Sequence, residues 1–185
     1  VERFDSTIGA GSILLPFGGK YQRTPEEGMA ALLPVLTGTT ETASIMTYGY
    51  NPYICSWSPF HGAVYSIVES LAKVAALGGD YKKVRLSFQE YFMRLGKQKE
   101  NWGKPLSALL GALYTEKKLN IPAIGGKDSM SGTFNDINVP ETLVSIAATY
   151  QNAGKIISSS LKKSGSKLIM LKAKSSLKDT VSMII

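Results

Sequence analysis

The chain has 185 residues, of which 44% are hydrophobic and 19% charged, a composition typical of a globular protein with a real core. Its single cysteine, Cys55, excludes an internal disulfide framework, and no apolar run approaches the roughly 20 residues of a membrane span. The net charge of +7 suggests nucleic acid as a partner, but the lysines and arginines are scattered along the sequence. We therefore expect a solvated surface, with neither a nucleic-acid nor a membrane partner.

Residues 1–40 are predicted to form a linker or arm. Glycines flank the apolar run at residues 13–15, which indicates one short strand. Residues 24–27 read TPEE, which has the form of a capping box with proline at the first helical position. They predict a short helix that ends before Pro34. The first residue is Val1 and no signal-peptide pattern follows, so we expect a fragment or an excised domain.

Residues 42–48 have the β-propensity of a strand. The next segment, residues 49–62, is rich in proline and aromatic residues, which predicts neither a regular helix nor a central strand. Cys55 and His61 suggest a nucleophilic cysteine activated by a histidine, but no acid that would orient the histidine accompanies them. A buried thiol is the favoured interpretation. The aromatic residues suit either stacking on a base or an interface: Tyr48, Tyr50, Tyr53, Trp57 and Phe60.

Four of the following segments are predicted to be regular elements. Residues 63–77 are the clearest helix, because apolar residues recur at helical spacing and two glycines follow. Residues 84–88 alternate strictly, as a half-buried strand does, and residues 142–150 also predict a strand. Residues 104–118 predict a second helix with four leucines directed inward. These leucines are Leu106, Leu109, Leu110 and Leu113.

The chain is predicted to divide at about residue 153. Residues 41–153 mix helices with half-buried strands, which favours an α+β domain with an antiparallel or mixed sheet. Beyond it we expect a short helix at residues 156–163, a buried strand at 168–171 and an opening helix at 175–185. Residues 154–185 are therefore predicted to be the truncated start of an α/β domain.

The most informative segment is residues 125–132, which read GGKDSMSG. Glycines let backbone N–H groups approach an anion closely, a lysine adds positive charge, and an aspartate can hold Mg²⁺. The candidate phosphate-binding residues are Gly125, Gly126, Lys127 and Ser129, with Asp128 as the metal ligand. The spacing is not that of a Walker A loop, and a solvated glycine-rich turn is the alternative interpretation.

Four segments, in this order, together resemble one family: residues 50–53 (YNPY), 57–65 (WSPFHGAVY), 88–92 (FQEYF) and 125–132. The family is phosphoribosylformylglycinamidine synthase, the glutamine-dependent amidotransferase of purine biosynthesis. More narrowly, the chain resembles the second of its two halves that are similar to aminoimidazole ribonucleotide synthetase. The resemblance runs from about residue 4 to residue 171.

The resemblance implies a cytoplasmic ligase that uses ATP to activate the formamide oxygen of formylglycinamide ribonucleotide. Ammonia from glutamine then displaces that oxygen to give the amidine. It implies two N-terminal domains whose sheets pair into a barrel-like core, with nucleotide sites near their interface and the aromatic segment facing the partner domain. The first synthetase-like half and the glutaminase domain would be the partners of this chain. Alone, it is expected to hold no catalytic residue, to be inactive, and to form a homodimer that imitates the natural pairing.

The resemblance also assigns Asp128 and Glu69 to Mg²⁺ bound to ATP or ADP. From the residues alone, an i,i+4 pair of Glu69 with Lys73 is favoured. Lys73 stands where relatives often carry Asn, and Met46 stands where they often carry Asp and cannot bind Mg²⁺. These departures favour an auxiliary nucleotide site over a catalytic one. The alternative is a structural module with a degenerate site that completes the barrel.

Overall fold

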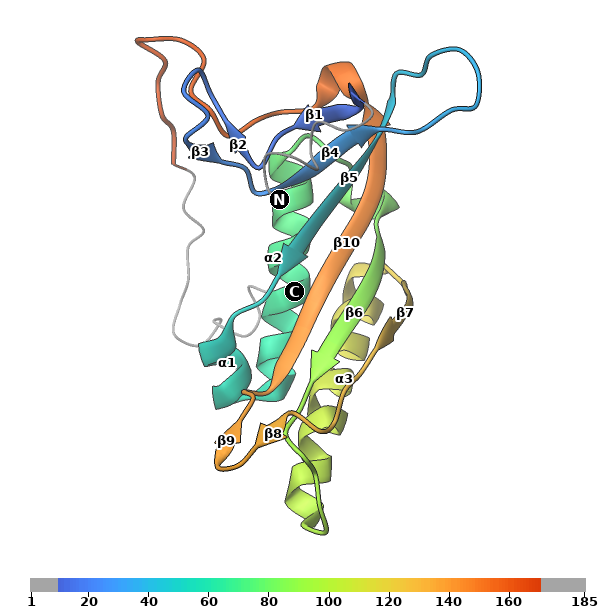
Figure 1. The fold of residues 1–185 in the computed structure, drawn as a ribbon, viewed down its shortest axis with the longest axis vertical. Coiled ribbons are helices and arrows are strands. Elements are labelled where there is room, and N and C mark those ends of the chain that lie inside the picture. The colour runs from blue at the N-terminus through green and yellow to red at the C-terminus, as the bar shows by residue number, and fades with distance from the viewer. Residues whose placement is uncertain (1–9, 171–185) are drawn as a thin grey trace.

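A six-stranded mixed sheet carries the fold in the computed structural model, which describes residues 10–170 (Figure 1). Its spatial order is β1–β4–β5–β10–β6–β7. The strands are β1 (Ser12–Leu14), β4 (Gly28–Leu32), β5 (Thr42–Gly49), β10 (Thr142–Asn152), β6 (Arg85–Tyr91) and β7 (Ala123–Lys127). Neighbours run antiparallel except β6 and β7, which are parallel. The predicted α+β class with a mixed sheet is confirmed.

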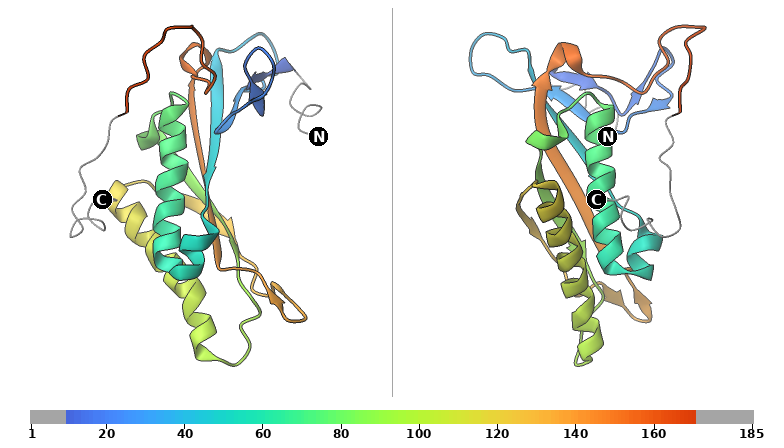
Figure 2. Two further views of the ribbon diagram at one scale, coloured as in Figure 1. Left: turned by 90° about the vertical axis from the view of Figure 1, so that its left-hand side faces the viewer. Right: turned by 180° about the vertical axis from the view of Figure 1, so that it is seen from behind.

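Two small hairpin pairs, one short helix and two long helices complete the described fold. The pairs are β2 (Phe17–Gly18) with β3 (Thr24–Pro25) and β8 (Thr133–Phe134) with β9 (Ile137–Asn138). The helices are α1 (Pro52–Trp57), α2 (Pro59–Ala76) and α3 (Lys99–Leu119), with 3₁₀ turns η2 (Tyr81–Lys83) and η3 (Ala153–Lys155). Figure 2 shows α2 and α3 on the same side of the sheet. None of the helices in residues 10–170 is long and apolar enough to cross a membrane.

The sheet has one buried face, because its long strands alternate inward and outward positions. Ile45 of β5, Leu86 of β6 and Ala147 of β10 are fully buried beneath the helices. The opposite face carries apolar residues that stay exposed, among them Met46 and Tyr150. β10 is the last strand of the chain, yet it lies between β5 and β6 and pairs with both.

Small residues let α2 approach the sheet and α3 closely. A Cβ on Gly49 of β5 would lie 2.1 Å from the Ser66 carbonyl oxygen of α2. A hydrogen bond of 2.9 Å between the Ser70 and Ser145 hydroxyls joins α2 to β10 inside the core. A Cβ on Gly111 of α3 would lie 2.2 Å from the Phe60 carbonyl oxygen of α2.

This close crossing overturns the predicted orientation of α3. The residues of α3 that face the core are mostly small, and they include Ala108, Gly111 and Ala112. The four leucines expected to point inward are exposed instead. A large leucine side chain does not fit where the α2 backbone passes so near to α3. The exposed leucines that were predicted to face the core are Leu106, Leu109, Leu110 and Leu113.

Two further predictions near the N-terminal half are wrong. Residues 24–27 do not start a helix, because Thr24–Pro25 pairs with β2 and β4 begins at Gly28. Residues 49–62 are largely helical, since α1 and α2 each begin with proline, where the missing N–H costs nothing. Asn51 and Ser58 cap the two helices with side-chain oxygens.

The segment after β10 is also irregular where regular structure was expected. No helix forms at residues 156–163, since the backbone N–H and hydroxyl of Ser159 both donate to the Glu26 carboxylate at 2.8 Å. Residues 168–170 are exposed and form no strand within the described chain. The helix expected at residues 175–185 lies outside the described residues. The division of the chain at residue 153 stays a prediction.

Candidate functional site

The glycine-rich segment forms an edge strand and the loop that follows it. β7 runs parallel to β6, so both strands end at the same edge of the sheet. The loop then continues along β6: the Ser129 N–H donates to the Glu90 carbonyl at 3.0 Å, and the Phe92 N–H donates to the Ser129 carbonyl at 2.8 Å. These bonds fix Asp128 at the carboxyl end of β7. The alternative prediction of a glycine-rich turn at residues 125–132 is wrong for residues 125–127, which belong to β7.

The two adjacent glycines of β7 have different roles. A Cβ on Gly126 would lie 2.5 Å from the Phe88 carbonyl oxygen, so close strand packing alone requires this glycine. Gly125 has a φ of 149°, which disfavours other residues, although a Cβ added there would meet no atom within 4 Å. The Lys127 ammonium donates a hydrogen bond to the Ser129 hydroxyl on the exposed side of the loop. Gly125, Lys127 and Ser129 therefore present polar groups at one accessible edge, beside Asp128.

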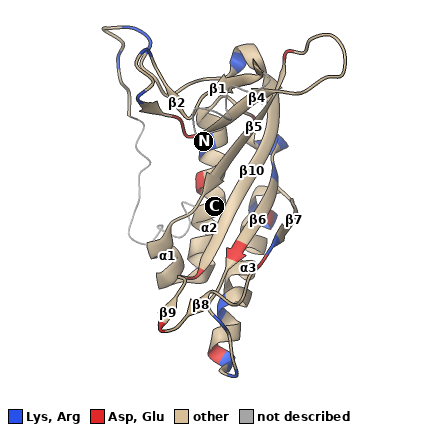
Figure 3. Cartoon of the chain, in the orientation of Figure 1, with Lys and Arg blue, Asp and Glu red and all other residues tan. Residues whose placement is uncertain are grey.

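Glu90 is a residue of this edge that sequence reasoning missed. It lies on the buried face of β6 and is 6% exposed. Burial, and secondarily the negative charge of Asp128, raise the pKa of its carboxyl from 4.5 to about 7. Extending the strict alternation of residues 84–88 by one step would have placed Glu90 on the buried face. Figure 3 shows acidic colour at the end of β6, whereas lysines and arginines are spread over many elements.

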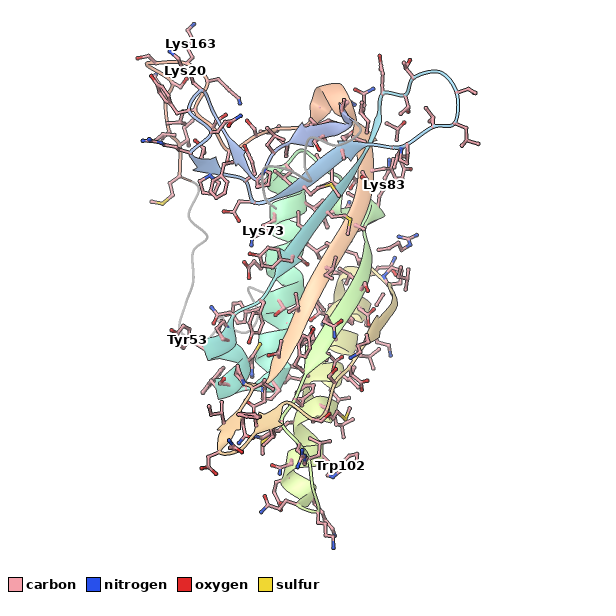
Figure 4. All side chains as sticks on the ribbon, in the orientation of Figure 1. Lys20, Tyr53, Lys73, Lys83, Trp102 and Lys163 are labelled. Atoms are coloured by element: carbon pink, nitrogen blue, oxygen red, sulfur yellow. The ribbon has the colours of Figure 1, made fainter. Side chains whose placement is uncertain are left out.

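The second predicted metal ligand, Glu69, is bound by a lysine. The Lys73 ammonium lies 2.8 Å from one Glu69 carboxylate oxygen and 3.4 Å from Glu27, and 4.5 Å above the Tyr48 ring. The other Glu69 oxygen accepts the Tyr50 N–H at 3.1 Å. Burial opposes the charge of Lys73, but hydrogen bonding and attraction to Glu69 and Glu27 outweigh it and raise the pKa. Figure 4 shows Lys73 beside α2 and β5.

The structure does not bring Glu69 and Asp128 together. Glu69 bonds to the end of β5, and β10 and β6 separate β5 from β7 in the sheet. Three strand spacings amount to roughly 14 Å, too far for two carboxylates to share one ion. Residues 10–170 contain no group of three or more His, Cys, Asp or Glu able to hold a metal. Asp128 with Ser129 fits a Mg²⁺ ion that takes its remaining ligands from phosphate and water. Glu69, as it stands, does not.

An apolar hollow of about 670 Å³ opens on the uncovered face of the sheet, beside the Glu27 and Tyr48 side chains that contact Lys73. Met29, Met46 and Ile146 line it together with Tyr48 and Glu27. Met46 pairs in register with Met29 and Ala148. Met46, where the family resemblance predicts a carboxylate, is therefore part of an apolar surface.

The Cys–His pair is not assembled for nucleophilic chemistry. Cys55 is 1% exposed and packs against Gly62, whose Cβ would lie 2.5 Å from the sulfur. Burial is the main cause of the raised pKa of its thiol, which keeps the sulfur protonated. His61 forms a 2.8 Å hydrogen bond through Nδ1 with the Ser58 hydroxyl. The predicted buried thiol is confirmed.

The aromatic residues do not form one stacking platform. Tyr48 lies under Lys73, whereas the Tyr50 hydroxyl bonds to Thr142 at 3.1 Å. Tyr53 and Trp57 are exposed on α1. The Phe60 ring lies 5.8 Å from Tyr114 of α3.

The mixed sheet, covered by two helices on one face, is an α+β fold shared with several solved structures. No protein-family model and no curated protein matches the sequence. The fold is similar to Thermotoga maritima PurL complexed with AMPPCP, at 13% identity and a TM-score of 0.64 over 84% of this chain and 24% of that chain. It is also similar to PurLQS from the same organism, at 14% identity and a TM-score of 0.62 over 80% and 22%.

A third similar structure is phosphoribosylformylglycinamidine synthase II from Thermotoga maritima, at 17% identity and a TM-score of 0.59 over 80% of this chain and 22% of that chain. Further structures of the PurL protein contain ADP or ATP. The present chain thus spans 22–24% of the length of these chains. Identities at this level show a shared fold.

Proposed function

We propose that this chain is a nucleotide-binding domain of a cytoplasmic ATP- and glutamine-dependent ligase. The parent would belong to the class that converts formylglycinamide ribonucleotide to formylglycinamidine ribonucleotide in purine biosynthesis. The role of this domain is auxiliary: it holds a nucleotide while the chemistry takes place elsewhere in the parent. The observation that carries the proposal is the accessible edge with Asp128, Lys127 and Ser129, in a fold shared with chains solved with ATP and ADP.

The nucleotide would bind through its phosphates at this edge. Lys127 and Ser129 would donate to phosphate oxygens, and N–H groups of Gly125 and Gly126 on the edge strand β7 would add dipoles of the same sign. Asp128 would hold Mg²⁺, which neutralises phosphate charge when bound. At Glu69, Lys73 already supplies a positive charge where a metal was predicted. We propose a nucleotide site in which Asp128 binds the Mg²⁺ ion and Glu69 is not a ligand.

The partners belong to the same proposal. The uncovered face of the sheet would pair with the corresponding sheet of the first synthetase-like half, and the glutaminase domain would complete the parent. An isolated chain would be inactive in amidine synthesis, because it spans only 22–24% of the length of the similar PurL chains.

The test is thermal unfolding with ADP and Mg²⁺. Ligand at a hundred times its Kd should stabilise the wild type by about 2.7 kcal/mol if it binds only the folded state. Asp128→Asn should lose the Mg²⁺-dependent part of this shift. The control Asp136→Asn changes an exposed aspartate in the β8–β9 turn and should keep it.

Equal shifts in all three proteins would contradict the assignment of Asp128. The absence of any shift, with ATP as well as ADP, would contradict nucleotide binding and would fit a structural module that completes the barrel.

A further inference from the structure

The outer face of α3 carries an apolar stripe that the fold does not use. Its five residues are Trp102 (57% exposed), Leu106 (57%), Leu109 (48%), Leu110 (49%) and Leu113 (48%). They lie opposite the small residues that pack against α2. Monomeric proteins rarely leave five large apolar side chains together on one helix face. We call these five residues the α3 stripe.

The spacing of the stripe matches the surface of a second helix. Trp102, Leu106, Leu109 and Leu113 follow one another at intervals of four, three and four residues. This is the repeat with which one helix inserts its side chains between those of another. A flat sheet or an extended strand would not select such intervals. Figure 4 labels Trp102 near the N-terminal end of α3.

Charge decides what kind of helix fits. Lys99 lies three residues before Trp102, and Lys117 lies four residues after Leu113, so exposed lysines continue the stripe at both ends. They are 18 residues apart (117 − 99), which is five turns, so both lie on the same side of α3. The helix N-terminus adds partial positive charge at the Lys99 end, where Gln98 provides no side-chain cap.

This arrangement argues against a second copy of the chain. Antiparallel pairing of two stripes would place Lys99 against the Lys117 of the second copy at each end. Parallel pairing would place each lysine against its own counterpart. Like charges opposed across a helix pair are destabilising in either orientation. A partner with carboxylates at the same two places would instead meet both lysines.

We propose that the α3 stripe is the docking surface for an amphipathic helix of another protein chain. That helix carries apolar residues at intervals of four, three and four. It also has an acidic residue at each end of this apolar row. Its acidic ends lie about 27 Å apart, the rise of five turns. The proposal does not depend on nucleotide binding, because the stripe and the Asp128 edge lie on separate elements.

A synthetic peptide tests the proposal against the full chain by fluorescence anisotropy. The peptide is a helix of about 22 residues with leucines at these intervals and glutamates at both ends, long enough for six turns. A control peptide replaces the glutamates by lysines. The glutamate peptide should bind at least tenfold more tightly than the lysine peptide, and the difference should shrink with salt. Leu109→Asp should weaken it at least tenfold, whereas Leu36→Asp, in an exposed loop, should not.

A charge swap keeps the test decisive if a stripe variant folds poorly. The double variant Lys99→Glu with Lys117→Glu should prefer the lysine peptide and reject the glutamate peptide. Equal affinity for both peptides, or unchanged binding by Leu109→Asp, would overturn the proposal. Sedimentation that shows self-association lost in Leu109→Asp would overturn it in favour of a second copy.

Discussion

Glu90 makes the stability of the protein depend on pH in an unusual direction. Its pKa is raised to about 7 in the folded chain from an ordinary 4.5, so the folded state binds the extra proton between these values. Stability from this group is therefore fully present below about pH 4.5 and is lost as the pH rises through about 7. A shift of this size corresponds to a loss on the order of 3 kcal/mol.

We expect Glu90→Gln to remove this loss, because the amide stays neutral at every pH. Urea unfolding between pH 5 and pH 8 should show wild-type stability falling relative to the variant. Glu100→Gln, at an exposed position of α3, is the control and should follow the wild type. A Glu90→Gln curve parallel to the wild-type curve would show that the carboxyl titrates normally.

Single residues of the site were predictable where the pattern was local. The Glu69–Lys73 pair follows from i,i+4 spacing alone, and the structure contains it. The location of Asp128 at a strand end depends on the parallel pairing of β6 and β7, which joins residues 37–38 positions apart and leaves no local signal. Glu90 was missed because a carboxylate on a buried face contradicts the usual rule.

At the scale of elements, the crossing of α2 and α3 depends on one missing side chain. Gly111→Ala would place a Cβ 2.2 Å from the Phe60 carbonyl oxygen, and backbone cannot move aside cheaply. Overpacking of this kind costs about 1–3 kcal/mol, more than the alanine gains in helix propensity.

Gly103→Ala is the matched control in the same helix, because nothing lies within 4 Å of its added Cβ. It should raise stability by about 0.5–1 kcal/mol through propensity. Urea unfolding of both variants measures the difference. A Gly111→Ala protein as stable as Gly103→Ala would mean that the helices do not cross as closely as described.

Elements with a strong local period were predictable, and elements defined by their neighbours were not. The periodic segments became α2, which begins earlier at Pro59, and β6 and β10, which run further to Tyr91 and Asn152. The leucines of α3 misled because the usual rule sends large apolar residues inward, whereas the core here needed glycine and alanine. Proline near residues 52 and 59 was taken to break helices, although it stands at their first positions.

At the scale of the whole molecule, the uncovered face of the sheet predicts self-association. Its exposed apolar residues are Met29, Met46, Tyr48, Tyr91 and Tyr150. Two copies pairing these faces would bury them, so we expect a homodimer in sedimentation. Met46→Glu should shift the protein to monomer, since a buried unpaired carboxylate is costly.

Leu36→Glu, in an exposed loop, should remain dimeric, and so should Leu109→Asp on the opposite side of the molecule. A wild-type monomer across a wide range of concentrations would contradict this prediction. A dimer insensitive to Met46→Glu would place the contact on another surface.

The central position of β10 also constrains how the protein is made. β5 and β6 are not neighbours in the described sheet, where β10 lies between them and pairs with both. A nascent chain that has left the ribosome as far as β7 therefore exposes the edges of β5 and β6 that will pair with β10. It also exposes the face of α2 that will pack on β10. The sheet closes only when residues 142–152 emerge, which makes assembly depend on contacts distant in sequence. Until then the growing polypeptide is a substrate for chaperones that shield strand edges.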